Sequence, residues 1–140
     1  MTASRPIRIL DIDHVVLRVR DMSLMRRFYC EVLGCGVQEE LPELDMVQLR
    51  AGRALIDLVD VAGTLGRQGG AAPGKEGRNM DHFCVRVEPF DADAIAAHLR
   101  AHGVEPGEVV QRSGAEGTGP SIYLDDPEGN MVELKGPSHA

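Results

Sequence analysis

The sequence predicts an α+β fold built from two tandem β-α-β-β-β modules, and three observations support this prediction. A run of Asp-His-Val-Val-Leu-Arg-Val begins at Asp13 and returns as Asp-His-Phe-Cys-Val-Arg-Val at Asp81. Each run is followed by a helical pattern that ends at a Gly-Val turn, and then by short strand patterns. A Gly-rich stretch without an apolar period separates the two copies. We therefore expect the strands to form a curved mixed sheet around a shared metal-binding cavity.

Module one is predicted as a strand, a helix and three further strands. Residues 11–19 alternate in the manner of a strand, and Asp21 or Ser23 can cap a helix that Gly34 ends. The remaining strands are predicted at 37–41, 46–50 and 54–60.

Module two repeats this order after the Gly-rich linker. A strand is predicted at 81–87, followed by a helix that begins after Asp91 and ends at Gly103. The turn Asp-Asp-Pro-Glu-Gly-Asn at 125–130 is typical of a hairpin. The remaining strands are predicted near 109–112, 122–124 and 131–135. The 140 residues are thus expected to form one domain, with module one at about 10–61, the linker at about 62–79 and module two at about 80–136.

The composition favours a small-molecule partner. The formal net charge is −7, whereas binding to nucleic acid or to an anionic membrane relies on clustered Lys and Arg. The N-terminal residues lack the apolar segment of a secretory signal, and no stretch reaches the roughly 18 apolar residues of a membrane span. The three cysteines show no Cys-x-x-Cys spacing, which is typical of reduced thiols in a core. We expect a cytoplasmic protein that binds neither nucleic acid nor membrane.

Four side chains at matched positions of the repeat suggest a metal site. The last strand of each module carries one acid among apolar neighbours, Asp57 in the first and Glu133 in the second. A carboxylate on such a strand is unfavourable unless something pairs with it. His14 and His82 begin the matching strands, and two imidazoles with two carboxylates suit Zn, Ni, Fe or Mn. A buried network of these groups that links the modules without a metal is the alternative.

Further motifs resemble those of a known superfamily. The helix motif Arg-Arg-Phe-Tyr-Cys-Glu-Val-Leu-Gly ends at Gly34, and Asp-Pro-Glu-Gly-Asn-Met-Val-Glu ends at Glu133. Together with the repeated Asp-His strand, they make residues from about 10 to 136 similar to the vicinal oxygen chelate superfamily. That group includes glyoxalase I, extradiol dioxygenases and bleomycin resistance proteins, and the chain resembles its single-domain glyoxalase I-like members most.

The resemblance implies roles for particular residues. It implies that His14, Asp57, His82 and Glu133 hold a divalent metal ion, and that Glu133 moves a proton, with Asp57 as a second catalytic acid. Arg18 and Arg78 match arginines that hold an anionic substrate in the related glyoxalases. Tyr123 falls where extradiol dioxygenases keep a tyrosine, and it is expected either to line the substrate pocket or to be a core aromatic.

Three functions remain open from the resemblance. The first is a metal-dependent lyase or isomerase, like lactoylglutathione lyase, that chelates a thiohemiacetal or an α-hydroxy or keto acid through two adjacent oxygens. The second is an Fe(II) extradiol dioxygenase that uses both histidines and Glu133. The third is a non-catalytic binding protein for an antibiotic or similar small molecule. The resemblance also implies a homodimer.

Overall fold

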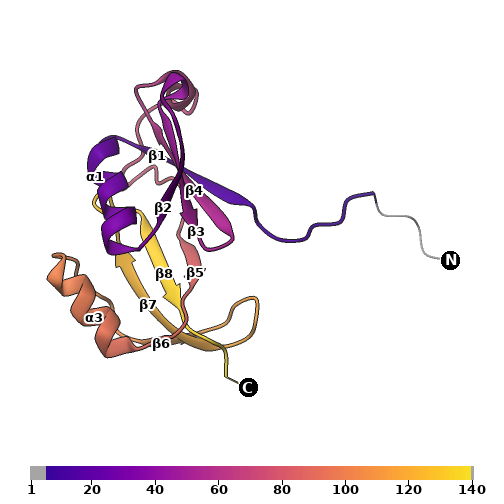
Figure 1. The fold of residues 1–140 in the computed structure, drawn as a ribbon, viewed down its shortest axis with the longest axis vertical. Helices are drawn as coiled ribbons and strands as arrows, with labels where there is room; N and C mark the ends of the chain where they lie inside the picture. Colours follow the sequence, from indigo (N-terminus) through magenta and orange to yellow (C-terminus); the bar gives the residue numbers. More distant parts are fainter. Residues whose placement is uncertain (1–5, 140) are drawn as a thin grey trace.

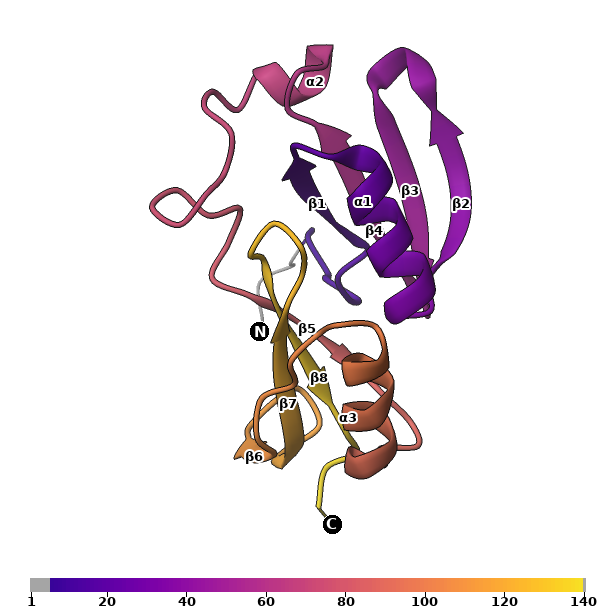
Figure 2. The same ribbon diagram turned by 90° about the vertical axis from the view of Figure 1, so that its left-hand side faces the viewer.

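The computed structural model describes residues 6–139 and confirms the two tandem modules. Figures 1 and 2 show module one above module two, with the long helix of each on the same side of the molecule. Module one contains β1 (His14–Val19), α1 (Met22–Arg27), η1 (Phe28–Val32), β2 (Gly36–Leu41), η2 (Pro42–Leu44), β3 (Met46–Ala51) and β4 (Ala54–Asp60). After α2 (Thr64–Arg67), module two contains β5 (Phe83–Arg86), α3 (Ala92–Ala101), β6 (Val110–Arg112), β7 (Gly119–Asp125) and β8 (Met131–Lys135).

Each module forms its own four-stranded sheet with the same topology. The strand order is β1-β4-β3-β2 in the first sheet and β5-β8-β7-β6 in the second. The first strand of each module runs parallel to the last strand, and the other neighbours are antiparallel. His14 at the start of β1 therefore lies next to the strand of Asp57, and His82, directly before β5, lies next to the strand of Glu133.

The helices begin where their capping residues predict. The Asp21 carboxylate accepts a hydrogen bond of 3.0 Å from the Leu24 amide at the start of α1, and Asp91 caps α3 through the Ala94 amide at 3.1 Å. The α1 segment continues as a wider π-helical turn through η1. Gly34 then adopts a φ of +79°, a backbone conformation that favours glycine and ends the helix.

One core joins both modules, and strand alternation decides which side chains enter it. Leu17 and Val19 of β1 are fully buried in this core, whereas His14, Val16 and Arg18 point to the opposite face of the sheet. The other strands of both modules follow the same rule. The core therefore also contains Leu49, Ile56, Leu58, Ile122, Leu124, Val132 and Leu134, together with Tyr29 and Leu99. The face opposite the core is left for polar and charged groups.

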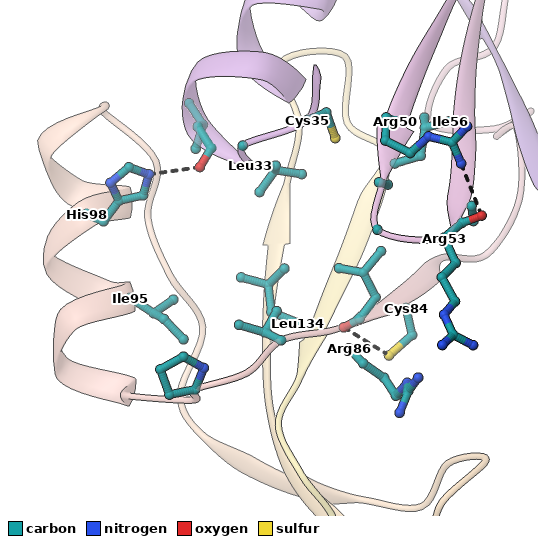
Figure 3. Close-up of a pocket in the computed structure, with 18 of the residues that line it drawn as sticks. Leu33, Cys35, Arg50, Arg53, Ile56, Cys84, Arg86, Ile95, His98 and Leu134 are labelled. Carbon is teal, nitrogen blue, oxygen red and sulfur yellow. Dashed lines mark hydrogen bonds between the residues drawn. The ribbon is translucent and has the colours of Figure 1, made fainter. Parts of the chain in front are cut away.

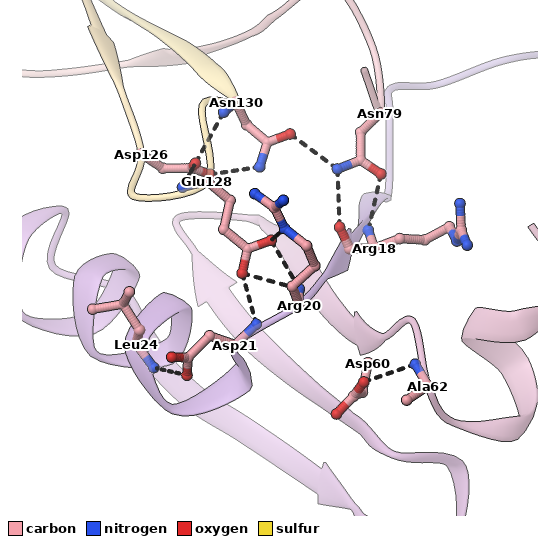
Figure 4. Close-up of polar contacts among 10 residues, drawn as sticks. All are labelled: Arg18, Arg20, Asp21, Leu24, Asp60, Ala62, Asn79, Asp126, Glu128 and Asn130. Atoms are coloured by element: carbon pink, nitrogen blue, oxygen red, sulfur yellow. Dashed lines mark hydrogen bonds and ion pairs between the residues drawn. The ribbon is translucent and has the colours of Figure 1, made fainter. Parts of the chain in front are cut away.

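The hairpin turn of module two is bonded to module one (Figure 4). The Glu128 carboxylate accepts hydrogen bonds from the backbone amides of Arg20 and Asp21, at 2.8 and 2.7 Å.

The Asn79 side chain accepts a bond of 3.0 Å from the Arg18 amide and donates one of 3.1 Å to the Arg18 carbonyl. Because it engages both backbone groups of Arg18, Asn79 pairs with the outer edge of β1 as a strand residue would.

Some local features differ from the sequence-based expectations. The linker was expected to lack regular structure, but it contains the single helical turn α2. The first strand is shorter than predicted, since residues 11–13 precede β1. All three cysteines are free thiols, but Cys84 was expected in the core and is exposed. It alternates with Phe83 and Val85, which face the core, so its side chain lies on the opposite face. Among residues 6–139, no helix is long and apolar enough to cross a membrane.

Candidate metal centre

His14 and Asp57 form a pair in module one. Because β1 and β4 are parallel neighbours, both side chains lie on the face opposite the core. The His14 Nε2 atom lies 4.0 Å from Asp57 Oδ2. The Asp57 side chain is only 3% exposed, whereas that of His14 is 45% exposed. Gln48, the cross-strand neighbour of Asp57, donates a long bond of 3.5 Å to the same Asp57 oxygen.

His82 and Glu133 form the matching pair in module two. His82 Nε2 lies 3.2 Å from Glu133 Oε1. The hydroxyl of Ser121 donates a bond of 2.6 Å to the other carboxylate oxygen of Glu133. Tyr123 is the cross-strand neighbour of Glu133, and its ring lies edge-on to the imidazole of His82 with centroids 5.6 Å apart. Module two thus fixes its acid more firmly than module one does.

Both imidazoles are oriented by the aspartate that precedes them. His14 Nδ1 lies 2.8 Å from Asp13 Oδ2, and His82 Nδ1 lies 2.6 Å from Asp81 Oδ1. These hydrogen bonds are the main reason that the pKa of each histidine is raised above its ordinary value. In the neutral ring, donation of the Nδ1–H to a carboxylate leaves Nε2 as a lone-pair nitrogen, whereas the protonated ring of His82 can donate its Nε2–H to Glu133. A carboxylate at Nδ1 is the second-sphere arrangement found around metal-binding histidines.

One carboxylate oxygen of module one has no partner. Asp57 Oδ1 is buried and accepts no hydrogen bond from the part of the chain that the structure describes. Burial raises the pKa of Asp57, although Gln48 and His14 oppose this effect. Buried carboxylate oxygens are normally hydrogen-bonded or bound to a cation. The unpartnered oxygen and the open Nε2 of His14 therefore fit a divalent cation as a missing partner.

Glu133 has the opposite electrostatic setting. Its burial works against the ionised form, but the Ser121 hydroxyl, Tyr123 and His82 together hold the pKa of Glu133 below its usual value. Glu133 is therefore ionised at neutral pH, as a metal ligand or general base must be.

The two pairs do not meet within one chain. Among residues 6–139, no three His, Cys, Asp or Glu side chains gather closely enough to hold a metal ion. The structure brings His14 to Asp57 and His82 to Glu133, but it does not bring all four together. Each module of the chain therefore carries half of the predicted ligand set.

The predicted substrate-binding residues have different surroundings. The Arg18 guanidinium donates to the carbonyls of Gly66, Gly70 and Ala71 at 3.0, 2.7 and 3.2 Å. A substrate anion would have to compete with these carbonyls or use the remaining N–H groups of Arg18. Arg78 is exposed, and its charge contributes to a lowered pKa of Asp81, whose largest cause is the hydrogen bond with His82. Tyr123 is half-buried beside the His82–Glu133 pair, with the Arg112 guanidinium 5.9 Å from its ring centre.

Sequence reasoning missed the groups that orient the ligands. Asp13 and Asp81 stand beside the two histidines in the repeat, and this repeated dipeptide was the available signal. Ser121 lies two residues before Tyr123 on the same strand face, so the alternation of β7 could have found it.

Comparison with known families gives a match over most of the chain. Residues 11–134 match the family described as the Glyoxalase/Bleomycin resistance protein/Dioxygenase superfamily. The chain is 30% identical to the glyoxalase domain-containing protein RDO1 of Mycosarcoma maydis, over 93% of this chain and 70% of that protein. It is 32% identical to the virulence protein STM3117 of Salmonella typhimurium, over 88% and 81% of the two chains. It is 30% identical to biphenyl-2,3-diol 1,2-dioxygenase 3 of Rhodococcus globerulus, over 87% of this chain and 60% of that protein.

Solved structures are similar over nearly the whole chain. An integron cassette protein from V. cholerae superposes with a TM-score of 0.74 and 26% identity, over 94% of this chain and 98% of that one. The crystal structure of STM3117 gives a TM-score of 0.73 and 28% identity, over 93% and 98%. A lactoylglutathione lyase from Agrobacterium tumefaciens gives a TM-score of 0.63 over 94% and 96%, but at 21% identity this likeness shows the fold alone.

Proposed function

Because the chain belongs to the Glyoxalase/Bleomycin resistance protein/Dioxygenase superfamily, we propose that it is a metal-dependent lyase or isomerase of the glyoxalase I type. The substrate class we propose is a small molecule with two adjacent oxygens, either a thiohemiacetal or an α-hydroxy or keto acid. The observation that carries the proposal is the unpartnered, buried oxygen of Asp57 beside the open Nε2 of His14. In a metal-free structural network, a buried carboxylate oxygen is normally given a hydrogen-bond donor, and Asp57 Oδ1 has none within the described residues.

The complete site is proposed to form between two copies of the chain. His14 and Asp57 of one copy would face His82 and Glu133 of the other, so that a symmetric homodimer would hold two sites. The separation of the two pairs within one chain supports this arrangement. The protein would then have a complete ligand set only as a dimer.

The chain's own residues would orient the substrate and move a proton. A bound divalent ion, which could be Zn, Ni, Fe or Mn, would polarise two substrate oxygens as a Lewis acid. Ser121 occupies Glu133 Oε2, so Oε1 is the oxygen that would take a proton from the carbon beside the substrate carbonyl and return it to the neighbouring carbon. Asp57, whose pKa is raised by burial, would serve as the second carboxyl on the opposite side.

Two arginines are proposed to bind an anionic group of the substrate. Arg78 is exposed and close to Asp81, so its guanidinium can reach a ligand beside His82 without breaking a bond within the described chain. Arg18 lies on the same strand face as His14, but its three carbonyl partners make it the weaker candidate. Tyr123 is proposed to contact the substrate beside His82.

Metal binding by purified protein tests the proposal directly. The protein would be stripped with a chelator and titrated with Zn(II) or Ni(II), beside the variants His14→Ala, His82→Ala and Glu133→Ala. We expect near-stoichiometric metal in the parent protein and a strong loss in each variant. His102→Ala, which alters the C-cap histidine of α3 outside both pairs, is the matched control. Metal that binds all three variants as tightly as the parent would refute the site.

Activity assays then separate the reaction classes. Turnover of the methylglyoxal–glutathione thiohemiacetal by Ni(II)- or Zn(II)-loaded protein supports the lyase, and Glu133→Gln should reduce this turnover far more than substrate binding. Binding of substrate analogues without turnover of any of them would instead favour a non-catalytic binding protein.

An extradiol dioxygenase is the second candidate. The 30% identity to biphenyl-2,3-diol 1,2-dioxygenase 3 and the position of Tyr123 beside His82 favour it. His14, His82 and Glu133 would form a two-histidine, one-carboxylate set suited to Fe(II) and oxygen. This chain spans only 60% of that dioxygenase's length. Ring cleavage of a catechol by anaerobically Fe(II)-loaded protein after exposure to oxygen would favour this reaction over the lyase.

A further inference from the structure

A large cleft lies between the two modules, apart from the proposed metal ligands. Its volume is about 1140 Å³, slightly above the roughly 300–1,000 Å³ that is typical of small-molecule pockets. Its walls include the end of η1, the turn between β3 and β4, β5 and α3, and none of the four proposed ligands lines it. The cleft is therefore a second candidate site, separate from the function proposed above.

One end of the cleft is apolar. Figure 3 shows Ile95 of α3, Leu134 of β8 and Leu33, just after η1, pointing into it. Leu134 belongs to the buried core, whereas Ile95 and Leu33 are only half-buried against that core. These half-buried side chains would leave water if an apolar group entered the cleft, and this burial favours binding. His98 donates a hydrogen bond of 2.8 Å to the Val32 carbonyl, so a contact between α3 and module one borders this end.

Arginines line the other end. Figure 3 shows Arg50, Arg53 and Arg86 on the side of the cleft away from α3. Arg50 and Arg53 come from the β3–β4 hairpin of module one, and Arg86 comes from β5 of module two. The lining of the cleft thus changes from apolar at α3 to cationic at the hairpin and β5.

The arginines keep N–H groups for a ligand. Within the described part of the chain, the Arg53 guanidinium makes no hydrogen bond or ion pair, and only the Arg53 carbonyl is engaged. Arg50 donates to this carbonyl and to the Gln38 side chain, each at 3.2 Å, so it has no acidic partner there. Arg86 pairs with Glu116 through one nitrogen, and both side chains are more than half exposed. Such a surface pair is weak and leaves the other donors of Arg86 free.

The acids on the wall do not neutralise this end. Asp13 is bound to His14, and Asp91 caps α3 through the Ala94 amide. Asp11, which is exposed, is the remaining acid of the lining. Three guanidinium groups therefore give this end of the cleft a local excess of positive charge, in a chain whose formal net charge is −7.

We propose that the cleft binds an amphipathic monocarboxylate with an unbranched hydrocarbon tail, a ligand of the fatty-acid class. The tail would lie between Ile95, Leu33 and Leu134, and the carboxylate would accept hydrogen bonds from Arg53 and Arg86. Guanidinium groups bind carboxylates through two parallel N–H donors. A ligand that is apolar at one end and anionic at the other matches both ends of the cleft, whereas a wholly apolar or wholly polar ligand matches only one.

A second copy of the chain matches the cleft less well. In the dimer proposed above, the partner would lie against the face that carries His14 and His82. The apolar end of the cleft lies on the opposite side of the sheets, where Leu99 and Leu134 belong to the core. A monocarboxylate could therefore enter the cleft whether or not the metal site forms, so this inference does not rest on the proposed function.

Calorimetric titration with dodecanoate, below its micelle-forming concentration, tests the inference. We expect one molecule bound per chain, with affinity that rises about three- to fourfold per methylene from octanoate to dodecanoate. Arg53→Glu and Arg86→Glu should each weaken the binding by about tenfold or more, because a charged donor is replaced by a like charge. Arg67→Glu, on α2 outside the cleft, is the matched control and should bind as the parent does. Dodecyltrimethylammonium, with the same tail and the opposite charge, should bind more weakly than dodecanoate.

Thiol alkylation locates the ligand. Cys35 lines the cleft, whereas Cys30, which is also half-buried, does not. Bound dodecanoate should slow the reaction of N-ethylmaleimide with Cys35 several-fold and leave the reaction of Cys30 unchanged. Mass spectrometry of the peptides would measure both rates in the same sample.

Two outcomes would overturn the inference. Dodecanoate that binds the parent and both arginine variants alike, without protecting Cys35, would show only adsorption to apolar surface. Absence of dodecanoate binding would also refute the site, and if Ile95→Glu then separated a dimer into monomers, the cleft would be a contact between copies instead. Chelator-stripped and metal-loaded protein should bind dodecanoate equally, so failure of the proposed metal site would leave this test unaffected.

Discussion

The Tyr29 hydroxyl donates a hydrogen bond of 2.7 Å to Asp126, and this contact joins residues 97 positions apart in the sequence. Tyr29 is fully buried at the end of the first helix, and Asp126 lies in the hairpin turn of module two. We predict that Tyr29→Phe lowers the free energy of unfolding by about 1–2 kcal/mol, the usual worth of one buried hydrogen bond. Urea denaturation would measure this.

Tyr29→Phe should lower the free energy of unfolding without changing metal affinity, because the Tyr29–Asp126 bond lies outside both histidine–acid pairs. An unfolding free energy equal to that of the parent would show that this contact does not hold the modules together.

The aspartates behind the histidines should control metal affinity. We predict that Asp13→Asn and Asp81→Asn each weaken Zn(II) binding by about 10- to 100-fold, because each removes the charged partner of an imidazole Nδ1. Competition with a chromophoric chelator would measure the dissociation constants. Asp93→Asn, an acid in the first turn of α3 distant from both pairs in sequence, is the control. Unchanged affinity in both variants would show that Asp13 and Asp81 do not support metal binding.

Metal affinity should depend on pH through the two histidines. Their pKa values are raised, mainly by the hydrogen bonds with Asp13 and Asp81, and a protonated imidazole cannot bind a metal. Affinity should therefore rise with pH until the histidines are neutral, with a midpoint above the ordinary histidine pKa of about 6.5. Asp13→Asn should lower the pH midpoint of the part of the metal affinity that depends on His14. Binding titrations across the pH range would detect this change. A midpoint that is the same in parent and variant would contradict this cause.

The raised histidine pKa values also make the folding stability of the metal-free protein depend on pH. This stability should fall as pH rises, whereas metal affinity should increase. A histidine whose pKa is higher in the folded state than in the unfolded state contributes stability that is fully present below pH of about 6.5 and is lost as pH rises through the folded pKa. Metal binding should remove this loss, since it favours neutral imidazole.

Arg18 distinguishes a structural role from substrate binding. Its three bonds to the carbonyls of Gly66, Gly70 and Ala71 hold the linker against β1. We predict that Arg18→Ala speeds limited proteolysis within residues 66–78 several-fold, because the linker loses these charged donors. Arg53→Ala, in the turn between β3 and β4, is a matched control for loss of charge. Weaker binding of an anionic substrate with an unchanged proteolysis rate would favour the substrate role.

The sequence predicted the modules well because strand alternation and helix capping act locally. The alternation around His14 and His82 was enough to assign one face to the core and the other to the ligands, and Asp21 and Asp91 cap their helices. The same alternation, applied to Cys84, would have placed this thiol on the ligand face.

Contacts that depend on the path of the linker could not be predicted. The partners of Arg18 are backbone carbonyls of a Gly-rich segment, and carbonyl groups have no signature in the sequence. Whether His14 meets His82 of its own chain or of another copy also depends on how the two modules are joined. The local sequence patterns that place each histidine beside its acid do not determine whether the two pairs meet within one chain or between two copies.

The most direct test of the shared site is complementation between two defective chains. His14→Ala damages only the first-module half, and His82→Ala damages only the second, so each variant alone should lack complete sites. If the site forms between copies, mixed dimers made by co-refolding differently tagged variants should each contain one intact site. Bulk metal binding in an equal mixture should then return to about a quarter of the parent's. No recovery in purified mixed dimers would contradict a metal site shared between two copies.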